Sequence, residues 1–169
     1  VQYDALTGNV IRTVLEEKHD KYVEPMHPLT FLPWDESKAV MQSQRDGYNH
    51  LYLLDLEKDE LKQITKGKWV VQEFVGFNTG ARRLIFRSNE SDPRKSCLYS
   101  VKVSGGKRTP LGAQEGVCYQ AQLSKSGAAV ISAYTGPDVP RSINLLSTIT
   151  GKGANILTAK DTWKENGYS

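Results

Sequence analysis

The chain has 169 residues, of which 38% are hydrophobic and 24% charged, and its net charge is +3. This composition indicates a globular domain with its own core rather than a disordered chain. No apolar run approaches the roughly 20 residues that a membrane helix needs, so we expect no membrane span. The weak and evenly spread basic excess argues against a nucleic-acid partner.

The chain contains two cysteines, Cys97 and Cys118, which could be free thiols or form one disulfide. Their spacing matches no metal motif, and two cysteines form at most one disulfide. Free thiols and a bridge between neighbouring strands both remain open, because a bridge requires suitable strand geometry. The sequence opens at Val1 without an initiator Met, which predicts a processed protein or a piece of a longer one.

An internal repeat is the dominant signal in the chain. Three segments of similar layout run over residues 28–67, 69–112 and 116–159. The spacing of equivalent positions is steady, at 46 residues from Phe31 to Phe77. A period of about 40 to 50 residues with four strands in each repeat is typical of β-propeller blades.

Short apolar runs between polar turns mark the expected strands. The first repeat is expected to hold strands at residues 29–32, 39–41, 51–55 and 61–65. The second is expected to hold them at residues 72–77, 84–86, 98–101 and 107–111. The third is expected to hold them at residues 119–123, 129–131, 143–146 and 154–158.

The flanking segments fit the same scheme. Residues 1–4 and 10–15, joined through Thr7-Gly8, are expected to be the last two strands of a preceding blade that ends at residue 17. Residues 160–169 are expected to start the next connection. No segment has a convincing helical period.

These features predict an all-β fold of consecutive four-stranded antiparallel blades. We interpret residues 1–169 as one fragment of a partial β-propeller, with about three and a half blades of an expected ring of about eight. Blades are stable because each covers its neighbour's apolar face. Blades at the two open ends would lack that cover, so we also expect self-association through open blade edges.

Three strings carry a family resemblance: Tyr22–Leu32, Gln44–Tyr52 and Gln63–Trp69. Gly47-Tyr48-x-His50 followed by Ile64-Thr65-Lys66-Gly67-x-Trp69 is the most specific combination. Together the strings resemble the amino-terminal propeller of the dipeptidyl peptidase IV family, within the prolyl oligopeptidases, and especially its Bacteroidetes members. The resemblance covers nearly the whole chain and fades after about Gly136.

The resemblance implies a serine exopeptidase that releases dipeptides from protein amino termini, with Pro or Ala in the penultimate place. It implies that the propeller gates access to an α/β-hydrolase domain of the same parent chain and docks it. It also implies peptide substrates, a periplasmic or secreted location and no cofactor. A stand-alone propeller scaffold that binds proteins and the propeller of another prolyl oligopeptidase-family hydrolase are the alternatives.

The resemblance also points to a loop near the substrate, which corresponds to residues 21–24. Tyr22 and Glu24 are therefore the candidate substrate-binding residues, although an ordinary packed loop would explain Tyr22 as well. The aromatic-plus-arginine pair of mammalian members is absent, because Val23 and Glu24 stand near those positions. The paired glutamates that hold the substrate amine in the family have no match here. Glu16-Glu17 is a pair in a different context, where an exposed loop is the simpler interpretation.

No catalytic residues are expected in this chain. A nucleophile elbow of the form Gly-x-Ser-x-Gly does not occur. The three histidines, His19, His27 and His50, have no visible nucleophile and acid as partners, and they lack the spacing of metal ligands. His50 begins an expected strand, where a structural hydrogen bond is the simpler role.

Overall fold

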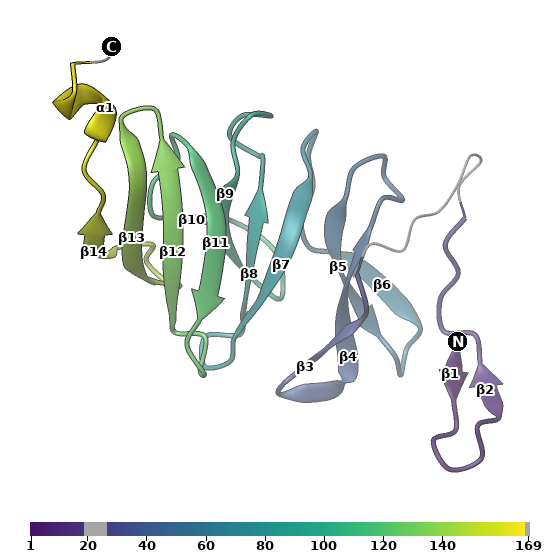
Figure 1. The fold of residues 1–169 in the computed structure, drawn as a ribbon. Helices are drawn as coiled ribbons and strands as arrows, with labels where there is room; N and C mark the ends of the chain where they lie inside the picture. The colour runs from purple at the N-terminus through teal and green to yellow at the C-terminus, as the bar shows by residue number, and fades with distance from the viewer. Residues whose placement is uncertain (19–26, 168–169) are drawn as a thin grey trace. The chain divides into compact units, whose positions relative to one another are not determined.

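The computed structural model describes residues 1–18 and 27–167. This part of the chain forms three four-stranded antiparallel sheets, one two-stranded sheet and one short helix (Figure 1). It divides into two compact units, residues 1–65 and 66–169, which are described separately below. The all-β fold of consecutive four-stranded antiparallel blades that the sequence predicts is confirmed.

The first unit holds a two-stranded sheet and a four-stranded sheet. The smaller sheet pairs β1 (Gln2–Tyr3) with β2 (Val10–Arg12). The larger sheet has strand order β3-β4-β5-β6, with β3 (Thr30–Leu32), β4 (Asp35–Ser43), β5 (His50–Asp55) and β6 (Glu60–Gln63). The Arg12 guanidinium joins the two sheets through hydrogen bonds of 2.9 and 2.8 Å to the two carboxylate oxygens of Asp59.

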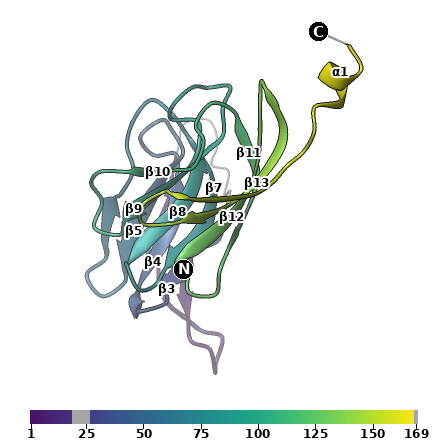
Figure 2. The ribbon, with the colours of Figure 1, turned by 90° about the vertical axis from the view of Figure 1, so that its left-hand side faces the viewer.

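The second unit holds two four-stranded sheets. One has the order β10-β9-β8-β7, with β7 (Val71–Asn78), β8 (Arg83–Ser88), β9 (Cys97–Lys102) and β10 (Thr109–Leu111). The other has the order β11-β12-β13-β14, with β11 (Val117–Leu123), β12 (Ala129–Gly136), β13 (Val139–Ser147) and β14 (Gly153–Thr158). The chain then leaves β14 as an extended segment that leads to α1 (Thr162–Glu165) (Figure 2).

The core of the second unit lies between its two sheets, which stand side by side (Figure 1). Six buried side chains form it: Ile85, Leu98, Leu111, Cys118, Val130 and Leu146. The first three come from β8, β9 and β10, and the others from β11, β12 and β13. Each sheet therefore buries an apolar face only by packing against the other, as blades of a propeller do.

The β1–β2 hairpin and the β13–β14 hairpin are built on the same turn. The Asp4 carboxylate accepts backbone hydrogen bonds from Leu6 and Thr7, at 3.0 and 2.7 Å, and Gly8 follows with a φ of 72°. The Ser147 hydroxyl accepts the equivalent bonds from residues 149 and 150, and the glycine at 151 has a φ of 71°. A positive φ is free of steric cost only for glycine, which explains both glycines.

Several element bounds differ from the sequence-based expectation, and three of the differences are informative. β12 and β13 pair as far as Gly136 and Val139, well beyond the strands expected at residues 129–131 and 143–146. β4 begins at Asp35, before the strand expected at residues 39–41, because Asp35 already pairs with Leu32. Residues 162–165 form a single helical turn in a segment expected to be a connection. In the two strand cases, backbone pairing outweighs the polar character of the side chains.

Candidate functional site

The two candidate substrate-binding residues, Tyr22 and Glu24, lie outside the described residues. Their assignment stays a prediction. The Glu16-Glu17 pair is described, and its carboxylates have separate partners. Glu16 is exposed and lies 3.2 Å from the Lys18 ammonium. Glu17 accepts a hydrogen bond from the Ser43 hydroxyl and forms an ion pair of 3.4 Å with Arg45. The pair therefore does not present two carboxylates to one ligand.

A cavity of about 450 Å³ lies in the first unit. Its lining is mostly apolar and includes Val14, Leu15, Leu29, Phe31, Met41, Leu54 and Leu56. Glu17 and Gln42 also line it. The Gln42 side chain is 8% exposed, and its Oε1 accepts a 2.8 Å bond from Asn49. Among the described residues, Gln42 Nε2 has no hydrogen-bond partner. The cavity is thus a mostly apolar space, and the Gln42 amide nitrogen beside it is itself buried.

His50 has the structural role that the sequence predicts. Its side chain is fully buried, and its Nδ1 lies 3.1 Å from the Thr65 hydroxyl oxygen. That hydroxyl oxygen also accepts the Leu51 amide at 2.9 Å, and His50 Nε2 lies 4.0 Å from a carboxylate oxygen of Asp46. At 4.0 Å the Asp46 carboxylate is beyond hydrogen-bond distance, and a catalytic triad would join the carboxylate to Nδ1 and the hydroxyl to Nε2, the reverse of what is seen here. Thr65 is also fully buried.

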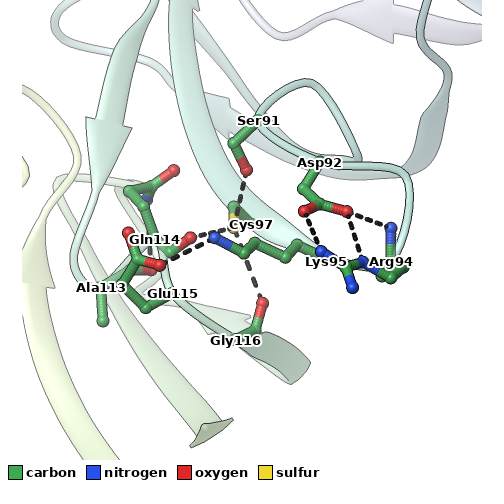
Figure 3. A network of polar contacts seen from close by, with 9 residues as sticks. All are labelled: Ser91, Asp92, Arg94, Lys95, Cys97, Ala113, Gln114, Glu115 and Gly116. Carbon is green, nitrogen blue, oxygen red and sulfur yellow. Dashed lines mark hydrogen bonds and ion pairs between the residues drawn. The ribbon is translucent and has the colours of Figure 1, made fainter. Parts of the chain in front are cut away.

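A network of charged side chains occupies the β8–β9 loop and the connection from β10 to β11 (Figure 3). Arg94 donates to Asp92 from Nε and Nη2, at 3.1 and 2.9 Å. Lys95 donates to the Glu115 carboxylate at 2.8 Å. The hydrogen bond from Arg94 is the main reason that the pKa of Asp92 is lowered to about 2. These charged side chains form ion pairs with one another. The network therefore orders the loops rather than presenting an unpaired charge to an ion.

The Cys97 thiol lies inside this network and is not bridged. Its Sγ is 3.6 Å from the Gln114 carbonyl oxygen and 3.8 Å from that of Gly116 (Figure 3). Cys118 is also a free, buried thiol, with its Sγ 3.3 Å from the Ser132 hydroxyl. Burial is the main cause that raises the pKa of both thiols. A raised pKa suppresses the thiolate, so neither cysteine has the character of a nucleophile.

An open hollow of about 410 Å³ lies beside the network in the second unit. It is lined by Arg94, Lys95, Glu115, Gly116, Val117, Thr135, Gly136 and Pro137. No group of three or more His, Cys, Asp or Glu side chains is placed to hold a metal ion in the parts of the chain that the structure describes. Over the same residues, no helix is long and apolar enough to cross a membrane. The hollow is thus lined by charged side chains of the network on one side and by Thr135, Gly136 and Pro137 on the other.

Consecutive four-stranded sheets that bury their faces against one another define a β-propeller type of protein. A family model described as the dipeptidyl peptidase IV (DPP IV) N-terminal region matches residues 1–141. The chain belongs to this family of DPP IV N-terminal regions, as the resemblance of its sequence strings implies.

Individual relatives agree with this assignment. A Trichophyton verrucosum protein described as a dipeptidyl-aminopeptidase B is 28% identical over 79% of this chain and 16% of its own length. A crystal structure of a Bacteroides ovatus protein, described as a dipeptidyl aminopeptidase IV, is 38% identical. Its TM-score is 0.76, over 89% of this chain and 24% of that chain.

The structure of Porphyromonas gingivalis dipeptidyl peptidase 4 shares the fold, with a TM-score of 0.75 and 22% identity. It matches over 92% of this chain and 22% of its own. The chain thus spans about a sixth of the curated relative and about a quarter of the solved chains.

Proposed function

We propose that this chain is the non-catalytic propeller portion of a dipeptidyl peptidase IV-like serine exopeptidase. In this role it gates the access of peptide substrates and docks the α/β-hydrolase domain of the same parent chain. The parent enzyme releases amino-terminal dipeptides with Pro or Ala in the penultimate place. It acts in the periplasm or after secretion.

Membership of the DPP IV N-terminal family, over residues 1–141, is the observation that carries this proposal. The chemistry of the described residues agrees with it. The Thr65 hydroxyl beside His50 is buried, and both thiols are buried. The sequence also lacks a Gly-x-Ser-x-Gly elbow. A chain built in this way can shape a passage for a peptide, while another domain supplies the nucleophile.

The first experiment compares hydrolysis of Gly-Pro-p-nitroanilide by the 169-residue chain and by a polypeptide that also carries the hydrolase domain. We expect turnover only from the longer polypeptide, because the nucleophile lies outside this chain. Turnover by the pure 169-residue chain that a serine-directed inhibitor abolishes would show that the proposal is wrong.

Gating is tested in the longer polypeptide by loosening the contact between the two sheets of the second unit. Val130 is fully buried in that contact, so Val130→Ala leaves a void there. We expect faster cleavage of long peptides relative to Gly-Pro-p-nitroanilide, because only large substrates are limited by the passage. Equal changes for both substrates would argue against a gate. Ile149→Ala, at an exposed turn position, is the matched control.

A further inference from the structure

The hairpin turns of the second unit gather at one end of its two sheets (Figure 1). Contacts between the sheets hold these turns together. The Thr79 amide donates to the Ser126 carbonyl oxygen at 3.1 Å, which joins the β7–β8 and β11–β12 turns. The Asn78 amide donates to the Thr148 hydroxyl at 2.8 Å, which joins the β7–β8 turn to the start of the β13–β14 turn. We call the four hairpin turns of the unit the turn end: residues 78–83, 102–109, 123–129 and 147–153.

Charge is segregated in the second unit. The turn end holds seven basic residues and no acidic one, so all seven acidic residues of residues 66–169 lie elsewhere. The ion pairs of the unit leave most of these basic side chains out, since Arg108 alone among them has a carboxylate partner. Among the residues that the structure describes, five of the basic residues are exposed and form no ion pair: Arg82, Lys102, Lys107, Lys125 and Lys152.

Arg83 is the buried member of this group, with 8% of its surface exposed. Its Nε donates to the Ser100 hydroxyl at 3.0 Å. Its Nη2 donates to the Ser100 carbonyl oxygen at 3.1 Å and to the Thr109 hydroxyl at 2.9 Å. All three acceptors are neutral, so these hydrogen bonds fix the guanidinium without balancing its charge. Burial accordingly lowers the pKa of Arg83.

A further blade could not supply the missing carboxylate. Arg83 lies two residues from Ile85 on β8, and alternation puts both on the face that the β11–β14 sheet already covers. Arg87 lies on the same face at the other end of β8, and there the Glu73 carboxylate is 2.6 Å away. Arg83 instead pairs across the sheet with Lys102, so a second positive charge stands beside it. A counter-charge must therefore come from outside the two sheets, at the turn end.

We propose that the turn end of the second unit binds an acidic polypeptide segment, with one carboxylate on Arg83 and others on the surrounding exposed lysines. Ser100 and Thr109 already orient the Arg83 guanidinium through Nε and Nη2, so its planar fork is set to meet a carboxylate. The exposed lysines stand on separate turns, which suits an extended chain better than a single small ion. This binding site is separate from the peptidase activity proposed above and does not depend on it.

A lipid surface is the less suitable partner for these charges. Proteins that lie on membranes insert large apolar side chains beside their basic residues. Among the described residues of the turn end, Ile149 is the one large apolar side chain that is well exposed. The recessed position of Arg83 also favours a side chain that can reach inward over a flat layer of head groups.

The test measures the binding of a labelled poly-glutamate peptide by fluorescence anisotropy. It uses the full parent polypeptide, so that every segment that normally covers the turn end is present. We expect saturable binding that weakens as salt is added, because the exposed charges are screened. A poly-glutamine peptide of the same length should not bind.

Variants locate the site. Lys102→Glu and Lys125→Glu should each weaken binding by at least about threefold, because each reverses an exposed charge at the turn end. Lys68→Glu is the matched control, since Lys68 is an exposed lysine before β7 and outside the turn end. Arg83→Lys keeps the net charge but loses the planar fork, so it should weaken binding by at least about tenfold. Far-UV circular dichroism checks that each variant is folded.

The proposal is overturned if the unchanged polypeptide does not bind poly-glutamate. It is also overturned if Lys102→Glu and Lys125→Glu bind as Lys68→Glu does. Unchanged binding by folded Arg83→Lys would show that diffuse charge, rather than a site at Arg83, attracts the peptide. Binding to phosphatidylglycerol vesicles without binding to the peptide would show that the partner is a membrane surface, and the proposal would be wrong.

Discussion

The backbone of Gly127 rests directly on the backbone of Phe77. A Cβ atom at Gly127 would lie 1.7 Å from the Phe77 carbonyl oxygen, and the φ of Gly127 is 72°. The contact joins the β11–β12 turn to the end of β7. Beside it, the Thr79 amide donates to the Ser126 carbonyl oxygen at 3.1 Å. The two sheets of the second unit can therefore approach at this end only because position 127 has no side chain.

Replacing Gly127 tests this contact. We expect Gly127→Ala to destabilise the second unit by more than about 2 kcal/mol, because the strain of a positive φ adds to a clash with backbone atoms. Gly106→Ala is the control, because Gly106 has a φ of 103° but nothing within 4 Å of the added atom. The control keeps the strain of a positive φ, about 1 to 2 kcal/mol, but should cost less than Gly127→Ala because nothing lies near the added atom. Denaturant unfolding measures both, and equal losses would contradict the proposed steric role.

We expect the folded chain to lose stability at alkaline pH because of Tyr52. Burial is the main cause that raises its pKa from 10.0 to about 12. The phenol loses its proton in the unfolded chain before it does so in the folded one. Its contribution to stability is therefore complete below about pH 10 and falls between about pH 10 and 12.

Tyr52→Phe should remove this alkaline loss. At neutral pH the change should be neutral or slightly stabilising, because the Tyr52 hydroxyl is buried without a hydrogen-bond partner among the described residues. Unfolding midpoints followed from pH 8 to about pH 12 check the prediction. A clear loss of stability for Tyr52→Phe at neutral pH would show that the hydroxyl makes a stabilising contact.

We expect the two cysteines to be unreactive toward thiol reagents in the folded chain. Cys97 and Cys118 are both buried and free, and burial raises the pKa of each thiol. We expect no rapid reaction with a disulfide reagent under native conditions and two reactive thiols after unfolding in denaturant. Fewer than two thiols in the unfolded, unreduced protein would reveal a bridge and contradict the structure.

The repeat and its strands could be predicted because they depend on local signals. Apolar runs such as Leu84-Ile85-Phe86, set between turn residues, mark a strand wherever it packs. The covered side of each sheet could not be predicted in the same way. Val130 and Ile131 are neighbours of similar character, yet Val130 is buried and Ile131 is exposed. Alternation separates two faces, and only the packing of another sheet decides between them.

The site was harder to predict than the fold, because its contacts join distant residues. Glu17 meets Ser43 and Arg45 across 26 and 28 positions, and no spacing rule foresees such a contact. The Cys97 environment likewise depends on Gln114 and Gly116, which lie in the connection after β10. The sequence pattern allows the two thiols to be either free or bridged by a disulfide. Only the tertiary contacts show which of the two holds.

The contacts of Arg108 with Glu90 and Trp69, inside one blade, can be tested by a conservative substitution. Its Nε lies 2.8 and 2.7 Å from the two carboxylate oxygens of Glu90, and its guanidinium carbon lies 5.1 Å from the centre of the Trp69 ring. A lysine keeps the charge but loses the planar fork and the stacking surface. We therefore expect Arg108→Lys to destabilise the second unit by about 1 kcal/mol.

The matched control is Arg94→Lys, since the Arg94 side chain is 88% exposed where it meets Asp92. Exposed ion pairs contribute little, so the control should change stability by less than about 0.5 kcal/mol. Unfolding in denaturant at low and high salt separates the two cases. Salt should weaken an exposed pair more than one that is partly buried and stacked. If the two arginines responded alike, Arg108 and Glu90 would form an ordinary surface ion pair, with no added stabilisation from the Trp69 ring.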